Sequence, residues 1–538
     1  MGRPHLTSRL LERLLELPPP LTRDVVVEKD LRVPMPDGGE LLADRWAPRA
    51  GGDSLPIALI RTPYGRRGLP INLLTRTLAE RGFQVVTQSA RGTFGSGGTF
   101  EAFRNERADG LATLDWLAEQ PWFTGAVVLT GASYTGYVQW AVADQLPEWV
   151  TAMIPTVTSA TIPVDLVSAL ESALSWDISV AGQERRGALL RLLLNLPKIK
   201  RAMHVLPLRQ ADAAFLGHHR QFYQDTLAHD ATDEHRADGD HRANAGRVTV
   251  PVSAVSGWYD LLLPGQLRDH QAVRETGQPA RLTIGPWQHS SSGVTREQLK
   301  QTLEFGLSYA RGEQPPPRPP VRLYVMGEEE WRDFESWPPP GYSPQRFHLQ
   351  PGGELSRDQP VESTVDRYRY DPADPTPAVG GPRLFSGAGK VDNAKLEARP
   401  DVLTYTTSVL ESDVEVIGEV SAEIWFRSSL RHADVFVRLC DVDSRGRSFN
   451  ICDGFISATN ADELRLVTVS LWPTAHVFKR GHRIRVQVSS GAFPLYGRNP
   501  GTGEPRADAV TLLTADQEVF HGADHPSAVI LPVRQKVC

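Results

Sequence analysis

The segment 131–136, which reads Gly-Ala-Ser-Tyr-Thr-Gly, limits most strongly how this chain can fold. An apolar run at 126–130 precedes it, and a helix-like stretch at 137–141 follows it. A serine at such a strand-to-helix junction occupies a tight, strained turn, with its hydroxyl raised above the sheet near the N–H groups that begin the helix. The pattern therefore identifies Ser133 as a candidate nucleophile.

Strand-like and helix-like stretches alternate around this segment. Two alternating runs within residues 24–50 are separated by the turn Pro36–Gly39, which is typical of a hairpin that enters a sheet. Alternation of strands and helices builds a mostly parallel sheet that is covered on both faces. The expected strands are 56–60, 82–87, 126–130, 248–256 and 280–284, and the expected helices are 70–80, 107–120 and 262–272.

Two changes of pattern divide the chain. Between residues 160 and 245 leucine-rich helical series replace the strand-like runs, which indicates a helical insertion over one end of the sheet. After Pro315–Pro320 the runs become short and evenly spaced, as in a sandwich or jelly roll. We therefore expect an N-terminal helical extension (1–23), an α/β-hydrolase domain in two parts (24–160 and 247–314), a helical cap (161–246) and a C-terminal jelly-roll β domain (321–538).

Composition excludes several classes of function. A net charge of −6 gives no reason to expect nucleic acid or an anionic membrane as a partner. No stretch reaches the ~18–20 apolar residues of a membrane span, and residues 1–20 lack the apolar segment of a secretory signal. The three cysteines, Cys440, Cys452 and Cys538, suggest neither a disulfide framework nor a metal site. We expect a cytoplasmic protein without metal, cofactor, nucleic-acid or membrane partner.

A nucleophilic serine needs a base, and the base needs an acid that orients it. In α/β-hydrolases these residues come in the order Ser, Asp, His, on loops that follow later strands. The strand-like run 250–255 leads into Asp260, and the next run, 282–284, leads into His289. Active sites of open α/β sheets gather at the carboxyl ends of strands. We therefore predict that Ser133 is the nucleophile, Asp260 the orienting acid and His289 the general base.

Each of these residues alone has an ordinary explanation. A Gly-x-Ser-x-x-Gly string occurs often by chance, Asp260 could cap the helix 262–272, and His289 is one of 15 histidines. Three such residues at strand ends, in the required order, favour a catalytic triad over coincidence.

Residues 131–136 closely resemble the Gly-x-Ser-Tyr-x-Gly motif of the cocaine esterase-like (CocE/NonD) hydrolases, which are related to Xaa-Pro dipeptidyl peptidases and α-amino acid ester hydrolases. Ordinary hydrolase elbows have glycine two residues after the serine, whereas Thr135 stands there in this chain. The resemblance covers residues 25 to 530. It is carried by Arg61–Gly65, Arg91-Gly92, Ser96–Gly98, Pro121-Trp122, Gly257–Asp260, Gly285–His289, Trp331 and Trp337–Pro339.

The resemblance implies the same layout of hydrolase domain, inserted helical cap and C-terminal jelly roll. It also implies that the Tyr64 hydroxyl and the Tyr134 backbone N–H form the oxyanion hole. Tyr64 follows the buried run 57–60, in the loop where hydrolases place their second oxyanion donor. The alternative for Tyr64 is a rim aromatic with a satisfied hydroxyl. The relatives have Asp before Arg-Gly where this chain has Ser89-Ala90 before Arg91, a departure that bears on a structural hydrogen bond and not on the triad.

Aromatic residues near the acid and the base are candidates for the wall of an acyl pocket. They are Trp258, Tyr259 and Trp287, although we expect at least one of them to pack in the core at the end of the sheet. In the cap, Trp176 and Phe222-Tyr223 could also line a pocket, but packing between helices is favoured. The His- and Asp-rich stretch 225–240 has no convincing ligand spacing, so we expect a solvated loop there.

We expect a serine hydrolase that cleaves a small-molecule carboxylic ester through an acyl-enzyme, without a cofactor. The main alternative is an amide-cleaving relative, an Xaa-Pro dipeptidyl peptidase or a β-lactam acylase, which must hold a substrate ammonium between carboxylates. Asp165, Glu171 and Asp177 are candidates for that role but form no specific cluster. A ligand-binding β domain on an inactive hydrolase is a further alternative, which the intact triad disfavours. The sequence leaves open whether the chain forms a homo-oligomer.

Overall fold

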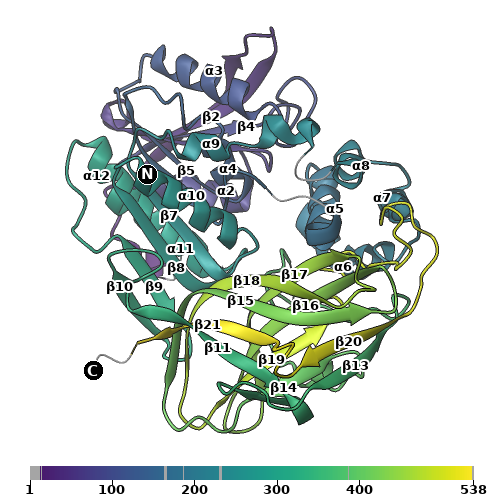
Figure 1. Ribbon diagram of the computed structural model, residues 1–538. Coiled ribbons are helices and arrows are strands. Elements are labelled where there is room, and N and C mark those ends of the chain that lie inside the picture. The colour runs from purple at the N-terminus through teal and green to yellow at the C-terminus, as the bar shows by residue number, and fades with distance from the viewer. Residues whose placement is uncertain are drawn as a thin grey trace.

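The computed structural model describes residues 12–13, 15–162, 166–185, 187–229, 233–385 and 387–535. Half of the extension predicted for residues 1–23 lies outside the described residues, as does Asp165. A large α/β unit and an all-β unit make up most of the structure, and a group of helices, α5 to α8, lies beside both (Figure 1).

A 10-stranded sheet forms the α/β unit, with the strand order β1-β2-β4-β3-β5-β6-β7-β8-β9-β10. Neighbouring strands from β4 to β9 are parallel, as the alternating pattern predicted, whereas β1, β2 and β10 add to the edges in antiparallel pairs. The strands are Val25–Pro34 (β1), Glu40–Pro48 (β2), Ile57–Thr62 (β3), Gln84–Ser89 (β4), Val127–Ala132 (β5), Val150–Thr156 (β6), Val252–Tyr259 (β7), Ala280–Gln288 (β8), Val321–Val325 (β9) and Glu330–Phe334 (β10).

Helices cover both faces of this sheet. One apolar core takes in residues of α3, α4 and α10, and a second takes in residues of α2, α11 and α12 on the opposite face. A π-helical turn at Thr302–Gly306 joins the last two of these helices. The helices are Leu69–Ala79 (α2), Glu106–Ala118 (α3), Tyr134–Trp140 (α4), Leu263–Glu275 (α10), Ser292–Gln301 (α11) and Leu307–Ala310 (α12).

No strand occurs in the described residues between β6 and β7, where helices form instead. Their core is small and also takes in Phe493 and Ala507 of the all-β unit. Trp176 of α5 packs against a separate cluster in the α/β unit, so these helices contact both units. None of the helices in the described part of the chain is long and apolar enough to cross a membrane. The inserted helices are Leu166–Gly182 (α5), Ala188–Ala202 (α6), Ala211–Leu216 (α7), Gln221–Ala228 (α8) and Arg242–Ala245 (α9).

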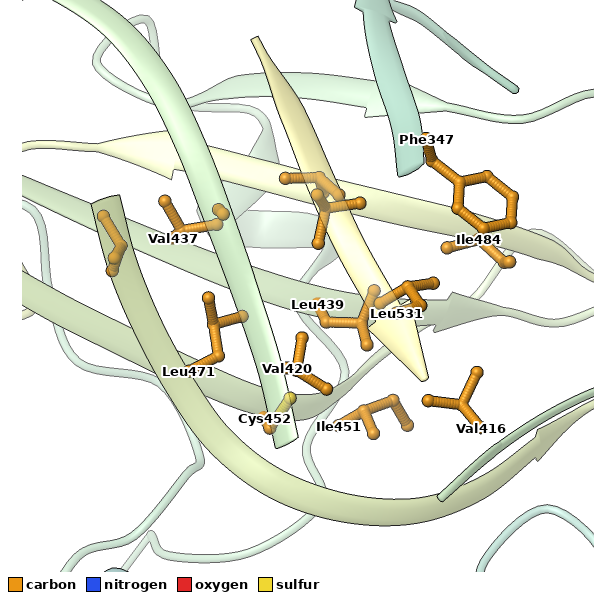
Figure 2. Close-up of a cluster of buried hydrophobic side chains, with 14 of the residues drawn as sticks. Phe347, Val416, Val420, Val437, Leu439, Ile451, Cys452, Leu471, Ile484 and Leu531 are labelled. Carbon is orange, nitrogen blue, oxygen red and sulfur yellow. The ribbon is translucent and has the colours of Figure 1, made fainter. Parts of the chain in front are cut away.

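The all-β unit is an 11-stranded sheet with the order β13-β20-β15-β18-β17-β16-β19-β14-β12-β11-β21. It curls around an apolar interior, because β21 at one end of this order pairs with β15 as well as with β11. Figure 2 shows side chains from strands far apart in sequence, among them Phe347, Leu439 and Leu531, gathered in that interior. The strands are Tyr342–Gln350 (β11), Glu354–Ser356 (β12), Thr364–Tyr370 (β13), Leu403–Thr406 (β14), Val414–Ser428 (β15), His432–Val442 (β16), Ser448–Thr459 (β17), Arg465–Phe478 (β18), Arg483–Ser489 (β19), Ala515–His521 (β20) and Ala528–Arg534 (β21), and Ala394–Glu397 forms the short helix α13.

Two strands that follow the boundary predicted at residue 321 belong to the α/β sheet. Strand β9 pairs in parallel with β8, and β10 pairs with β9, so residues 321–334 extend the α/β sheet rather than the all-β unit. The alternating pattern of β9 identified a strand correctly but could not specify which sheet it joins. One continuous core, which includes residues of β7, β8, β9 and the all-β strands, holds the two units together.

Candidate active site

His289 links Ser133 and Asp260, as the strand-end positions predicted. Its Nε2 lies 2.9 Å from Ser133 Oγ, and its Nδ1 lies 2.6 Å from Asp260 Oδ2. A carboxylate only accepts hydrogen bonds, so Nδ1 carries the proton and Nε2 of the neutral ring accepts from the serine hydroxyl. Asp260 is fully buried, and its other oxygen accepts a hydrogen bond of 2.8 Å from the backbone N–H of Leu262. Hydrogen bonds therefore hold both oxygens of the Asp260 carboxylate.

Each of the three residues directly follows the carboxyl end of a parallel strand. Ser133 follows β5, Asp260 follows β7 and His289 follows β8, and these strands lie close together in the middle of the sheet. Sequence-distant side chains therefore meet at one edge of the sheet.

The backbone at Ser133 is strained. Its φ of 57° and ψ of −124° fall in a region that non-glycine residues seldom occupy, and such strain costs about 1–3 kcal/mol. Hydrogen bonds hold the turn: Ser133 N–H donates to Thr156 O (2.9 Å), and the Thr158 hydroxyl donates to Ser133 O (2.8 Å). Glycine is required at position 131 because the backbone of Thr135 lies very close to it. A Cβ at this position would lie 2.4 Å from the carbonyl oxygen of Thr135.

Tyr64 lies beside the serine and is held by a residue of the inserted helices. The indole N–H of Trp176, in α5, donates a hydrogen bond of 2.9 Å to the Tyr64 hydroxyl oxygen. The Tyr64 side chain is 39% exposed because it lines the cavity in front of Ser133. Loss of hydration raises the pKa of Tyr64 above its ordinary value, and hydrogen bonds with Trp176 and Ser133 oppose that rise in part. The phenol is therefore a neutral donor.

Tyr134 contributes its backbone at the first position of α4, where helical N–H groups have no acceptor within the helix. Its side chain is buried and donates a hydrogen bond of 2.7 Å to Glu106, while Phe103 N–H donates to the Tyr134 oxygen at 3.1 Å. Glu106 in turn forms a buried ion pair of 2.9 Å with Arg61. Burial, with a smaller contribution from Glu106, raises the pKa of Tyr134 well above its ordinary value. This network, which sequence reasoning missed, anchors the residue that follows Ser133.

A small cavity opens next to Ser133. The centre of a water molecule could occupy a volume of about 50 Å³ within it. Trp176 and Phe222 line it, although packing among the helices was the favoured prediction for both. The other lining residues are Tyr64, Phe103, Ser133, Tyr134, Ile162, Ser172, Ala173, Leu261, Leu262, His289 and Leu384. The walls are therefore mainly apolar and come from both units and from α5 and α8.

Trp258, Tyr259 and Trp287 are not among the residues that line this cavity. Trp258 and Tyr259 are buried in the core, as was expected of at least one of the three. The indole of Trp258 is buried and donates to Tyr324 O (2.7 Å), and the Tyr259 hydroxyl donates to Asn450 O (3.1 Å) of the all-β unit. Trp287 packs against Trp331, with ring centroids 5.7 Å apart. Trp258 and Tyr259 therefore lie in the core shared by the two units, whereas Trp287 packs against a residue of the α/β sheet itself.

The candidate acids for an ammonium site are already paired where the structure describes them. Glu171 in α5 forms a bidentate ion pair with Arg383 of the all-β unit, with Arg383 Nε 2.7 Å from Glu171 Oε2. Asp177 in the same helix accepts hydrogen bonds of 3.0 and 3.2 Å from Arg220. Asp165 lies outside the described residues. Among the residues that the structure describes, no group of three or more His, Cys, Asp or Glu side chains could hold a metal ion.

Comparisons with known proteins place these features in a family. Residues 37–291 match the family model described as X-Pro dipeptidyl-peptidase (S15 family), and residues 317–530 match the X-Pro dipeptidyl-peptidase C-terminal non-catalytic domain. A cocaine esterase from Rhodococcus sp. (strain MB1 Bresler) is 32% identical over 569 residues, which cover 94% of this chain and 98% of that protein.

Solved structures share the fold over almost the full chain. An aminopeptidase from the marine sediment archaeon Thaumarchaeota archaeon has a TM-score of 0.83 and 22% identity, covering 97% of this chain and 99% of that one. An α-amino acid ester hydrolase has a TM-score of 0.80 and 22% identity, covering 96% of this chain and 98% of that one. At this identity the likeness establishes the arrangement of an α/β domain and a C-terminal all-β domain, and no more.

Proposed function

Because this chain belongs to the cocaine esterase-like (CocE/NonD) family of serine ester hydrolases, we propose that it cleaves carboxylic esters through an acyl-enzyme on Ser133. In this proposal His289 is the general base and Asp260 orients it. The hydrogen-bonded chain from Ser133 Oγ through His289 to Asp260 carries the proposal, because it is the geometry that activates a hydroxyl for acyl transfer.

In the first half-reaction Ser133 Oγ attacks the ester carbonyl carbon while its proton passes to His289 Nε2. The carbonyl oxygen becomes an oxyanion, which accepts hydrogen bonds from the Tyr64 hydroxyl and the Tyr134 backbone N–H. Collapse of this intermediate breaks the bond to the alkoxy oxygen, which takes the proton from His289 and leaves as the alcohol. In the second half-reaction His289 removes a proton from water, the resulting hydroxide attacks the acyl-enzyme, and Ser133 regains its proton as the acid departs.

Trp176 sets the direction in which the Tyr64 hydroxyl donates. An indole N–H can only donate, so the Tyr64 oxygen acts as acceptor in that hydrogen bond of 2.9 Å. The phenolic proton is then available for a second partner, and the Tyr64 hydroxyl also interacts with the Ser133 side chain. We propose that this proton is donated to the oxyanion. A donor oriented before the reaction needs no reorganisation in the transition state, which is what makes such donors effective.

Helices α5 to α9 are proposed to act as the cap, since α5 and α8 supply Trp176 and Phe222 to the wall of the cavity. The all-β unit is proposed to be a jelly roll, which agrees with its mostly antiparallel, closed strand order. A cytoplasmic location is also proposed: Cys440 and Cys452 are both free and buried, as in proteins of reducing compartments.

An amide-cleaving activity has less support. A substrate ammonium needs an unpaired carboxylate in the pocket, and both described candidates, Glu171 and Asp177, are bound to arginines. The small apolar cavity suits a short, neutral acyl group instead.

A panel of p-nitrophenyl esters from acetate to octanoate, run beside Xaa-Pro-anilides, tests this function. We expect turnover of the short esters, falling with acyl length, and no measurable cleavage of the anilides. Turnover of the anilides in preference to every ester would overturn the proposal in favour of a peptidase.

A further inference from the structure

One ion pair joins the inserted helices to the all-β unit directly behind the candidate acyl pocket. Glu171 lies in α5, and Arg383 lies in the loop between β13 and α13. Their side chains are only 9% and 5% exposed. The next residue in each segment, Ser172 after Glu171 and Leu384 after Arg383, lines the cavity beside Ser133. Each member of the ion pair is therefore the chain neighbour of a residue that lines the pocket.

The loop holds the Arg383 side chain in place through its own backbone. Arg383 N–H donates to Gly381 O (3.0 Å), and Gly381 and Gly389 exchange backbone hydrogen bonds of 2.9 Å across the loop. A Cβ at Gly387 would lie 2.9 Å from Nη1 of Arg383, so glycine at this position leaves room for the guanidinium. Asn450 of β17 ties Gly389 to the buried interior of the unit with a hydrogen bond of 3.0 Å. The guanidinium is therefore presented to Glu171 by a segment whose backbone is hydrogen-bonded at Gly381, Arg383 and Gly389.

We propose that Arg383 is a specificity-determining residue, because it engages both oxygens of Glu171, a carboxylate next to the pocket, and so restricts the enzyme to acyl groups without an α-ammonium. This inference rests on the proposed ester hydrolase function. It goes further in naming the residue that excludes α-amino acyl groups, and that residue comes from the all-β unit rather than from the α/β unit that carries the triad.

The charge balance of the pocket gives the reason. A buried carboxylate without a partner attracts a cation, whereas a carboxylate paired with a guanidinium already has its charge balanced and attracts a second cation less strongly. Asp177, six residues further along α5, is also paired with an arginine, Arg220, mainly through its Oδ1. Apart from Ser172, the pocket residues next to the pair and several others that line the cavity are apolar, among them Leu384, Leu261 and Leu262. An ammonium group that entered would lose its water without gaining a counter-ion.

Matched substrates that differ by one amino group test the inference. We compare kcat/KM for ethyl butyrate and for ethyl 2-aminobutyrate by titration of the released acid. The wild-type protein should prefer the butyrate by about a hundredfold or more, and Arg383→Met should reduce that ratio by about tenfold or more. Glu171→Gln combined with Arg383→Met removes the freed carboxylate and should restore the preference for butyrate.

The reciprocal variant keeps the test decisive if Arg383→Met does not fold. Glu171→Gln leaves the guanidinium without its anion, so this variant should gain activity on ethyl hydrogen succinate, relative to ethyl valerate, by about tenfold. Arg209→Met is the matched control. Arg209 also joins the inserted helices to the all-β unit, through Asp508 at 2.7 Å, but the pair is exposed and neither residue lines the cavity. This control should change neither ratio.

Unchanged ratios in folded Arg383→Met, or in Glu171→Gln if the former does not fold, would overturn the inference while the proposed function stands. If the wild-type protein hydrolyses none of the neutral esters, the proposed function fails instead, so the two failures are distinguishable.

Discussion

The indole N–H of Trp176 donates a hydrogen bond of 2.9 Å to the hydroxyl oxygen of Tyr64, and thereby connects helix α5 to the oxyanion side of the site. The Trp176 ring is stacked on Tyr134 at an interplanar angle of 8° and on Phe103 at 27°, so the donor is itself held in place. The inserted helices therefore do more than cover the cavity: through Trp176 they position a group of the proposed catalytic machinery.

This relationship predicts coupled effects of two substitutions. Tyr64→Phe should lower kcat by about two to three orders of magnitude, because it removes one oxyanion donor. Trp176→Phe keeps an aromatic ring but loses the N–H, and should lower kcat by about fivefold, the value of one neutral hydrogen bond. In the Tyr64→Phe background the second substitution should have almost no further effect on kcat. Steady-state kinetics on p-nitrophenyl acetate measure this cycle.

Additive effects in that cycle would show that Trp176 acts only as a pocket wall. Phe222→Leu is the control for a change in the shape of the cavity wall. Phe222 packs against Trp176 and lines the same cavity, but its side chain has no group that can hydrogen-bond to Tyr64. It should alter KM more than kcat.

Tyr134→Phe separates stability from catalysis. The substitution retains the backbone N–H proposed for the oxyanion hole but leaves Phe103 N–H and one oxygen of Glu106 without their buried partner. We expect a loss of about 1–3 kcal/mol in the free energy of unfolding, with kcat reduced by less than about tenfold. Urea denaturation and ester kinetics on the same preparation check both. A loss of kcat as large as that of Tyr64→Phe, with unchanged stability, would contradict this assignment.

Buried His270 makes stability depend on pH. It is 2% exposed, and burial, with a smaller contribution from Arg274, lowers the pKa of its imidazole to about 4. In the unfolded chain the pKa is about 6.5. Between these values the unfolded chain binds a proton that the folded protein does not, so stability falls as the pH falls from about 6.5 to 4, by up to about 3 kcal/mol.

Replacement of His270 by Gln should therefore flatten the dependence of the unfolding free energy on pH within that window. Part of the slope should remain, because burial also lowers the pKa of His241 to about 4. Urea unfolding at several pH values measures the slopes, and parallel curves for the two proteins would contradict the account of His270.

The positions of the triad residues could be predicted because they depend on short-range signals. Each of Ser133, Asp260 and His289 follows an apolar run that is long enough to identify a strand, and parallel strands place their carboxyl ends at one edge of a sheet. Strand β6, Val150–Thr156, was not predicted, because Pro155 interrupts its pattern and proline argues against a central strand.

Features that depend on the contact between units could not be predicted. Leu384 and Arg383 lie in a loop without periodicity, and nothing in the local sequence indicates that the loop reaches the cavity. Trp258 was predicted near the pocket from its distance to Asp260 along the chain. In the structure its ring packs in the core shared with the all-β unit, which local sequence does not reveal.

The most direct measurement of the central claim is the mass of the protein after reaction with a fluorophosphonate, followed by peptide mapping. The account predicts one phosphonyl group per chain, on Ser133, with heat-denatured protein unlabelled and with no adduct on folded Ser133→Ala. An adduct on a different residue, or equal labelling of Ser133→Ala, would contradict the claim that His289 and Asp260 activate this serine.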